Sequence, residues 1–210
     1  MKLFKNARNT TQVPTPDAGP AIAAFWSWWT ANADRLAATF DARDVEAINR
    51  LGEETAQQVT AIDPDLTFEY GPGDSSRHRL MVTASGNPRL RALADQWLAA
   101  APPADEAFAF DSWKQPNPNP GDIVLGLGEV RVDLVSSTVA LAPDGARTAV
   151  ELFHPGFAEL PDEVRGQITF LFLDMTVGEQ VVETRIGRVS WTDTEPAGAV
   201  PLTTLPSLLV

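Results

Sequence analysis

No other part of the chain constrains the fold as strongly as residues 22–40, IAAFWSWWTANADRLAATF. At 100° per residue the apolar side chains of this segment fall on one stripe and the polar ones fall opposite. The stripe consists of Ile22, Phe25, Trp26, Trp29, Ala33, Leu36, Ala37 and Phe40. Burying its large side chains contributes on the order of 10 kcal/mol, about the net stability of a whole domain. The pattern therefore predicts an amphipathic helix at the centre of a hydrophobic core.

Two residues of this helix are candidate ligand- or partner-binding residues. Trp28 lies at the rim of the stripe, where it either packs at the edge of the core or contacts a partner. Asn32 lies within the stripe, where a buried amide needs hydrogen-bond partners. We expect edge packing for Trp28 and a backbone hydrogen bond for Asn32, with a pocket lined by both as the alternative.

The composition is that of a globular protein without disulfides. Of the 210 residues 44% are hydrophobic, which suits one sizeable domain or two small ones. No apolar run approaches the roughly 18 residues of a membrane span, and no apolar segment of a signal peptide follows the basic N-terminus. The chain has no cysteine, which excludes thiol nucleophiles and thiolate metal sites. We therefore expect a cytoplasmic protein that does not enter a membrane.

The charge balance is strongly acidic. The formal net charge is -12, and the basic residues are scattered along the chain. Proteins that bind a phosphate backbone need clustered Lys and Arg, so the sequence argues against a nucleic-acid ligand. An acidic surface is compatible with a basic protein partner.

The order of the predicted elements indicates an α+β fold. Residues 1–20 are polar and carry prolines, which predicts a flexible tail. After the aromatic helix, Asp41 is predicted to cap a second helix over residues 45–62, which completes an N-terminal helical hairpin. Two β-β-α-β units follow, and we expect them to form an antiparallel or mixed sheet with helices packed on it.

A Pro-rich connector separates the two predicted units. The first unit has strands at residues 66–70, 78–84 and 107–113 and a helix at 87–102 capped by Asn87. Alternating prolines in QPNPNPGD, residues 115–122, exclude a helix or a strand interior there. The second unit has strands at residues 130–139, 147–154 and 182–191 and a helix at 161–177.

The connector also bears on domain organisation. We predict a single α+β domain over residues 21–210. The alternative is a subdivision into 21–114 and 122–210, joined by the Pro-rich loop 115–121. The pattern leaves open whether the two units share one sheet.

The segment QITFLFL, residues 167–173, suits either a helix or a buried strand. We predict a helix because Pro161 suits its first turn, Gly178 suits its end, and apolar side chains recur at helical spacing. A helix that is apolar on both faces needs two covering surfaces. We expect the aromatic N-terminal helix to supply one of them.

Four segments resemble those of an uncharacterised, actinobacterial-type family of bacterial proteins of unknown function. These are FWSWW at residues 25–29, IDPDLTFEYG at 62–71, LDMTVGE at 173–179 and RIGRVSW at 185–191. The similarity spans most of residues 20–205. Members of the family usually have histidine before the Pro-Asp-Leu segment, where this chain has Asp63. The resemblance implies one intact domain and supplies no activity, substrate or catalytic residue.

Few residues are available for a catalytic site. No nucleotide-binding, zinc-protease or serine-hydrolase motif occurs in the chain. Of the two histidines, His78 begins a strand between arginines, which favours a solvated strand end. His154 ends a strand before Pro155-Gly156, a place where loops often present functional groups. The alternative for His154 is a turn histidine that hydrogen-bonds to the backbone.

Asp174 and Glu179 are the candidate carboxylates. Asp174 follows four apolar residues, which predicts desolvation and a raised pKa unless an arginine pairs with it. Glu179 comes just after Gly178, and two neighbouring carboxylates are what general acid–base chemistry uses. A salt bridge to arginine, or simple exposure, is the structural alternative for both.

No catalytic constellation in the sequence is specific. We therefore expect a non-enzymatic binding or regulatory module, with neither cofactor nor metal, on the basis of Trp28, the acidic surface and the connector. A hydrolase-like small-molecule enzyme that uses His154 with Asp174 or Glu179 is one alternative. A protein partner of the immunity or chaperone type is the other.

Overall fold

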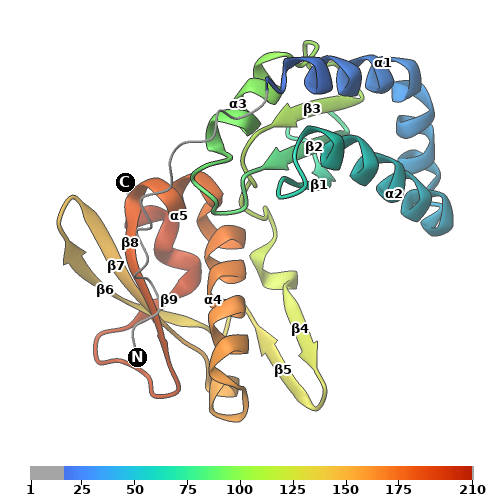
Figure 1. Cartoon of the computed structure of the whole chain (residues 1–210). Helices are drawn as coiled ribbons and strands as arrows, with labels where there is room; N and C mark the ends of the chain where they lie inside the picture. The colour runs from blue at the N-terminus through green and yellow to red at the C-terminus, as the bar shows by residue number, and fades with distance from the viewer. Residues whose placement is uncertain (1–16, 210) are drawn as a thin grey trace.

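The aromatic segment forms a helix as predicted, but α1, Gly19–Ala42, begins earlier, so Gly19 and Pro20 belong to the helix and not to the predicted tail. The computed structural model describes residues 17–209, so most of the predicted tail at residues 1–20 lies outside the described residues. The fold is α+β, with a helical pair followed by strands and helices (Figure 1). The N-terminal half consists of α1, α2 (Val45–Ile62), β1 (Thr67–Pro72), β2 (His78–Thr83), α3 (Arg91–Ala99) and β3 (Phe108–Asp111).

The predicted helix caps of this half are wrong. Arg43 takes a left-handed conformation with φ 55° and ends α1, so Asp41 still belongs to that helix. The cap of α2 is Asp44, whose side chain accepts a hydrogen bond from the backbone N–H of Ala47 at 3.0 Å. The third helix begins at Arg91 rather than at residue 87, because the Asn87 side chain accepts from the N–H of Arg89 and forms a turn.

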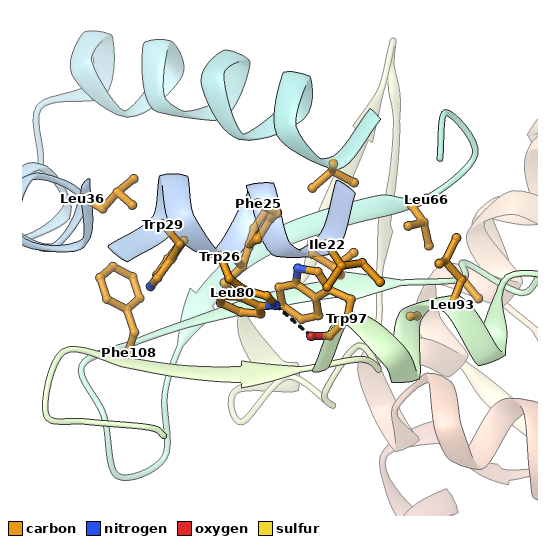
Figure 2. Close-up of a cluster of buried hydrophobic side chains, with 14 of the residues drawn as sticks. Ile22, Phe25, Trp26, Trp29, Leu36, Leu66, Leu80, Leu93, Trp97 and Phe108 are labelled. Atoms are coloured by element: carbon orange, nitrogen blue, oxygen red, sulfur yellow. Dashed lines mark hydrogen bonds between the residues drawn. The ribbon is translucent and has the colours of Figure 1, made fainter. Parts of the chain in front are cut away.

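The first sheet has the strand order β1-β2-β3, with β1 antiparallel and β3 parallel to β2. Helix α1 covers one face with an aromatic cluster, and the indole N–H of Trp26 donates to the Trp97 carbonyl of α3 at 3.0 Å (Figure 2). Phe25 and Trp29 are almost fully buried in the same cluster. The aromatic stripe is therefore the centre of the first hydrophobic core, as its pattern predicts.

The C-terminal half repeats the β-β-α-β order and adds a small hairpin. Its strands are β4 (Val124–Leu127), β5 (Val130–Asp133), β6 (Thr138–Asp144), β7 (Arg147–Phe153), β8 (Ile186–Thr192) and β9 (Val200–Pro201). Its helices are α4 (Asp162–Val177), α5 (Glu179–Arg185) and the short 3-10 segments η1 (Pro120–Asp122), η2 (Pro155–Glu159) and η3 (Leu202–Ser207). The large sheet has the order β8-β7-β6-β9, while β4 and β5 pair only with each other.

Two strand predictions in this half need correction. Residues 130–139 form two strands, β5 and β6, because a turn in which the Asp133 side chain accepts from the Ser136 N–H at 2.8 Å interrupts them. Residues 182–185 belong to α5, which starts directly after Gly178, and the strand begins only at Ile186. The helix prediction over 161–177 is confirmed by α4.

The two halves have separate hydrophobic cores. Side chains of α1, α2, α3 and the first sheet form one core, and those of α4, the large sheet and η3 form the other. The expectation that α1 covers the outer face of α4 is wrong: α1 packs on the first sheet, and Phe170 on α4 is 48% exposed. The strands make three sheets rather than one.

Among residues 17–209, none of the helices combines the length and the apolar character that a membrane span requires.

Candidate functional site

A pocket of about 460 Å³ lies where the two halves meet. Three segments line it: the β1–β2 hairpin of the first sheet, including its turn residues Gly73 and Asp74, the connector from Lys114 to Asn119, and α4. Such a volume is in the range of small-molecule sites. The pocket therefore is the candidate functional site.

The alternation of the first sheet determines what faces the pocket. Phe68 and Tyr70 of β1 and Leu80 and Val82 of β2 pack into the aromatic core, so the residues between them point to the opposite face. These are Glu69, Gly71, Arg79 and Met81, and all of them line the pocket. The β2 strand is thus buried on both faces, by the core on one side and beneath the pocket on the other.

Hydrogen bonds fix the connector against the C-terminal end of α4. The Asn117 N–H donates to the Met175 carbonyl at 2.7 Å. The Lys114 N–H donates to Glu179 Oε2 at 2.9 Å, and the Glu179 N–H donates to the Lys114 carbonyl at 3.0 Å. A Pro-rich segment without a strand partner is therefore held in one place, and the pocket has a defined wall.

Close packing at Gly178 reinforces this junction. Gly178 has φ 80°, a region that side-chain-bearing residues rarely adopt. A Cβ atom added there would lie 3.0 Å from Pro116 Cδ and 3.2 Å from the Lys114 carbonyl oxygen. Because Gly178 has no side chain, the connector can pack directly against the backbone between the end of α4 and the start of α5.

Asp174 is the most perturbed acid at the pocket. Burial raises the pKa of Asp174 to about 6, and the negative charges of Glu179, Glu183 and Glu69 act in the same direction, while Lys114 opposes them. The side chain lies on α4 and lines the pocket. The sequence prediction of a desolvated Asp174 agrees with this geometry, since no arginine pairs with it among residues 17–209.

Arg79 forms the charged floor of the pocket. It is only 8% exposed and forms ion pairs with Asp74 and, at 2.9 Å, with Asp111. Burial raises the pKa of Asp111, and the charge of Arg79 opposes that effect. The Arg79 guanidinium is therefore already neutralised by two carboxylates.

The structure does not bring the three candidate catalytic residues together. The negative charge of Glu179 acts on Asp174 at the junction. His154 follows β7 and does not line the pocket: its Nδ1 accepts from the Gly156 N–H at 2.9 Å, and its Nε2 faces Asp133 at 3.8 Å. Burial lowers the pKa of His154, and Asp133 opposes that shift. His154 thus fits the hydrogen-bonded turn residue that the sequence offers as its alternative.

Glu179 is almost completely buried, at 2% exposure, and serves the connector rather than lining the pocket. Its second oxygen, Oε1, has no hydrogen-bond partner among the described residues, and neither has Oε1 of Glu183. Burial raises the pKa of Glu183, and the charge of Glu179 adds to the shift. These two acids and Asp174 concentrate negative charge at the junction.

The two candidates on α1 lie away from the pocket. Trp28 is partly buried and packs edge-on against Phe25 and Trp29. The Asn32 amide donates to the Trp28 carbonyl at 2.8 Å, and its oxygen accepts from Arg35. Neither residue lines the pocket between the halves.

Sequence reasoning missed Glu69, Arg79, Met81 and Lys114 as site residues. The alternation that placed Phe68, Leu80 and Val82 in a core also places their neighbours on the other face, so a signal was present. Nothing in the sequence, however, indicates that α4 covers that face. In the described part of the chain no three His, Asp or Glu side chains group in a way that could hold a metal ion.

No protein-family model, curated protein or solved structure matches this chain.

Proposed function

We propose that this chain is a non-enzymatic binding module and that its small-molecule ligand occupies the pocket between the two halves. The observation that carries the proposal is the pocket itself, a space of about 460 Å³ lined by apolar side chains together with a few charged groups. Binding sites for small molecules typically combine these two features. The cytoplasmic location expected from the sequence remains part of the proposal.

The fixed connector supports the proposal. Hydrogen bonds from Asn117 and Lys114 hold it on α4 and α5, so the wall does not have to be ordered when a ligand arrives. A preformed site loses less conformational entropy on binding than a mobile one.

A thermal-shift screen of the purified protein against a metabolite library tests this function. A ligand that binds only the folded state raises the melting temperature. Leu171→Trp should abolish the shift because it fills the pocket from α4. Phe170→Trp is the matched control, since that neighbouring side chain is exposed. Stabilisation that survives Leu171→Trp, or a library without any hit, would contradict the proposal.

A hydrolase-like activity is a second candidate, and the raised pKa of Asp174 is the observation that favours it. A carboxyl group with a pKa of about 6 can exchange protons near neutral pH. His154 does not belong to this site, so Asp174 would act without it. Hydrolysis of nitrophenyl esters or phosphates that is lost in Asp174→Asn would establish this candidate. If none of these substrates is hydrolysed, the result favours the binding module over the enzyme.

The expectation of an immunity- or chaperone-like protein partner rests on the acidic surface and on Trp28. The packing of Trp28 against its own core weakens the second argument. The pocket gives the binding module a more specific basis than a surface contact does.

A further inference from the structure

The charged groups around the pocket do not balance. Glu69, Asp74 and Asp174 carry negative charge there, while Arg79 and Lys114 carry positive charge. Arg79 is occupied by its ion pairs with Asp74 and Asp111. Apart from these ion pairs, the pocket has two negative charges, on Glu69 and Asp174, and one positive charge, on the ammonium group of Lys114.

The Asp174 carboxylate has neither a hydrogen bond nor an ion pair within the described residues. In the part of the chain that the structure describes, no hydrogen-bond donor reaches this group, and Lys114 acts on it only through its charge, without an ion pair. The side chain is half-buried, and it borders an open space of about 460 Å³. A half-buried charge of this kind is stabilised by an opposite charge and a hydrogen-bond donor in the same space.

The rest of the lining combines apolar side chains of β2 and α4 with the amides Gln115, Asn117 and Asn119 of the connector. Met81 lies at the base, and Leu171 and Met175 come from α4 on the same side as Asp174. Methionine side chains adapt to irregular apolar groups. A ligand that pairs with Asp174 and packs on these apolar side chains therefore has a cationic head and an apolar body.

We propose that the pocket takes a small organic cation, a primary ammonium or guanidinium group on an apolar body, with Asp174 as its counter-ion. This inference rests on the proposed binding function and adds its ligand class. The head group donates to the Asp174 carboxylate, and Glu69, which also lines the pocket, adds a second negative charge. The net charge of -12 on the whole chain attracts such ligands from a distance.

Lys114 is the internal competitor of the ligand. Its ammonium group is the positive charge that already acts on Asp174, so it repels a second cation. The backbone of Lys114, by contrast, is fixed by Glu179. Replacing only the side-chain charge should leave the wall in place and make the pocket more favourable for a cation.

The test is isothermal titration of the full chain with phenethylammonium, with phenethyl alcohol as the neutral analogue and phenylacetate as the anionic one. Phenethylammonium should bind at least about tenfold more tightly than either analogue, because only it can pair with the Asp174 carboxylate. Asp174→Asn should weaken its binding by about tenfold or more. Lys114→Gln should strengthen binding by about threefold, a gain that loss of structure would not produce.

The pH profile is an independent arm of the same test. The groups that face Asp174 are Lys114 on the connector, Glu179 and Glu183 on α5, and Glu69 on β1. Since the pKa of Asp174 is about 6, binding at pH 5 should be about tenfold weaker than at pH 7.5. In Asp174→Asn this dependence should disappear.

The outcomes separate the two proposals. Equal affinity for the three analogues, or cation binding that is unchanged in Asp174→Asn, overturns the ligand class. Tighter binding of phenylacetate, abolished by Leu171→Trp, overturns the ligand class but keeps the binding pocket. If Leu171→Trp affects no ligand at all, the proposed function fails as well.

Discussion

Asp174 illustrates how a single residue links the site to stability. Burial raises the pKa of its carboxyl group to about 6, above its ordinary value, so the folded state holds the proton more tightly than the unfolded state. The proton's contribution to stability is complete below the ordinary pKa and is lost as the pH rises through about 6. At neutral pH the ionised carboxylate therefore destabilises the fold in the absence of a ligand.

From this follows a prediction about Asp174→Asn. The variant should be more stable than the wild type at pH 8, by about 1–2 kcal/mol, because it removes a desolvated charge. The difference should shrink as the pH falls below about 6 and vanish near pH 4. Urea unfolding at several pH values measures it. A variant that is less stable at pH 8 would show that the carboxylate has a favourable partner.

The residue scale also shows what a sequence can reveal about the site. Asp174 stands out because apolar residues precede it, and that signal is local. The alternation of β1 indicates which face Glu69 lies on, but the role of Glu69 and Lys114 at the site depends on contacts between β1, the connector and α4 that no local pattern encodes. His154 was a candidate because it precedes a turn. In the structure its side chain accepts a hydrogen bond from the Gly156 N–H within that turn.

At the scale of elements, the α4–α5 break determines the shape of the pocket wall. Gly178 was correctly predicted to end α4, but the valines after it suggested a strand where α5 forms. The helix forms because it can pack against the large sheet and carry Glu179 to the connector. Tertiary contacts thus override the local strand preference of Val181 and Val182.

Gly178→Ala is the corresponding prediction. A methyl group at this position meets Pro116 and the Lys114 carbonyl, and the backbone takes φ 80°. We expect a loss of about 2–3 kcal/mol in unfolding free energy.

Gly52→Ala in α2 is the matched control, since nothing lies within 4 Å of its added methyl group. It should stabilise the protein by up to about 1 kcal/mol, because alanine favours a helix more than glycine does. Chemical denaturation compares the two variants. Equal effects of both would mean that the connector does not pack on the break as described.

At the scale of the whole molecule, two cores share one junction. The sequence predicted two β-β-α-β units, and the periodicity of apolar residues was sufficient for that. It could not predict that each unit keeps its own core, because the pairing of helices with sheets depends on long-range packing. The site lies at the junction of the two halves, and the periodicity of apolar residues does not predict how the halves pack together.

The junction leads to a prediction about cooperativity. Because Glu179 and Asn117 fix the connector to α4 and α5, we expect the described part of the chain to unfold in a single calorimetric transition. Glu179→Ala removes the acceptor of the Lys114 N–H and should separate the transition into two. Gln180→Ala, at the exposed neighbouring position, should leave it single. Two transitions in the wild type would favour the subdivision into 21–114 and 122–210.

Methyl NMR of the methionines tests the central claim, ligand binding at this pocket, most directly. The chain has three methionines, and two of them, Met81 and Met175, line the pocket. Titration with phenethylammonium, or with any compound that stabilises the protein, should move both methyl signals together and saturably. The same titration of Leu171→Trp should leave them in place. A stabilising compound that moves neither signal in the wild type would contradict the account.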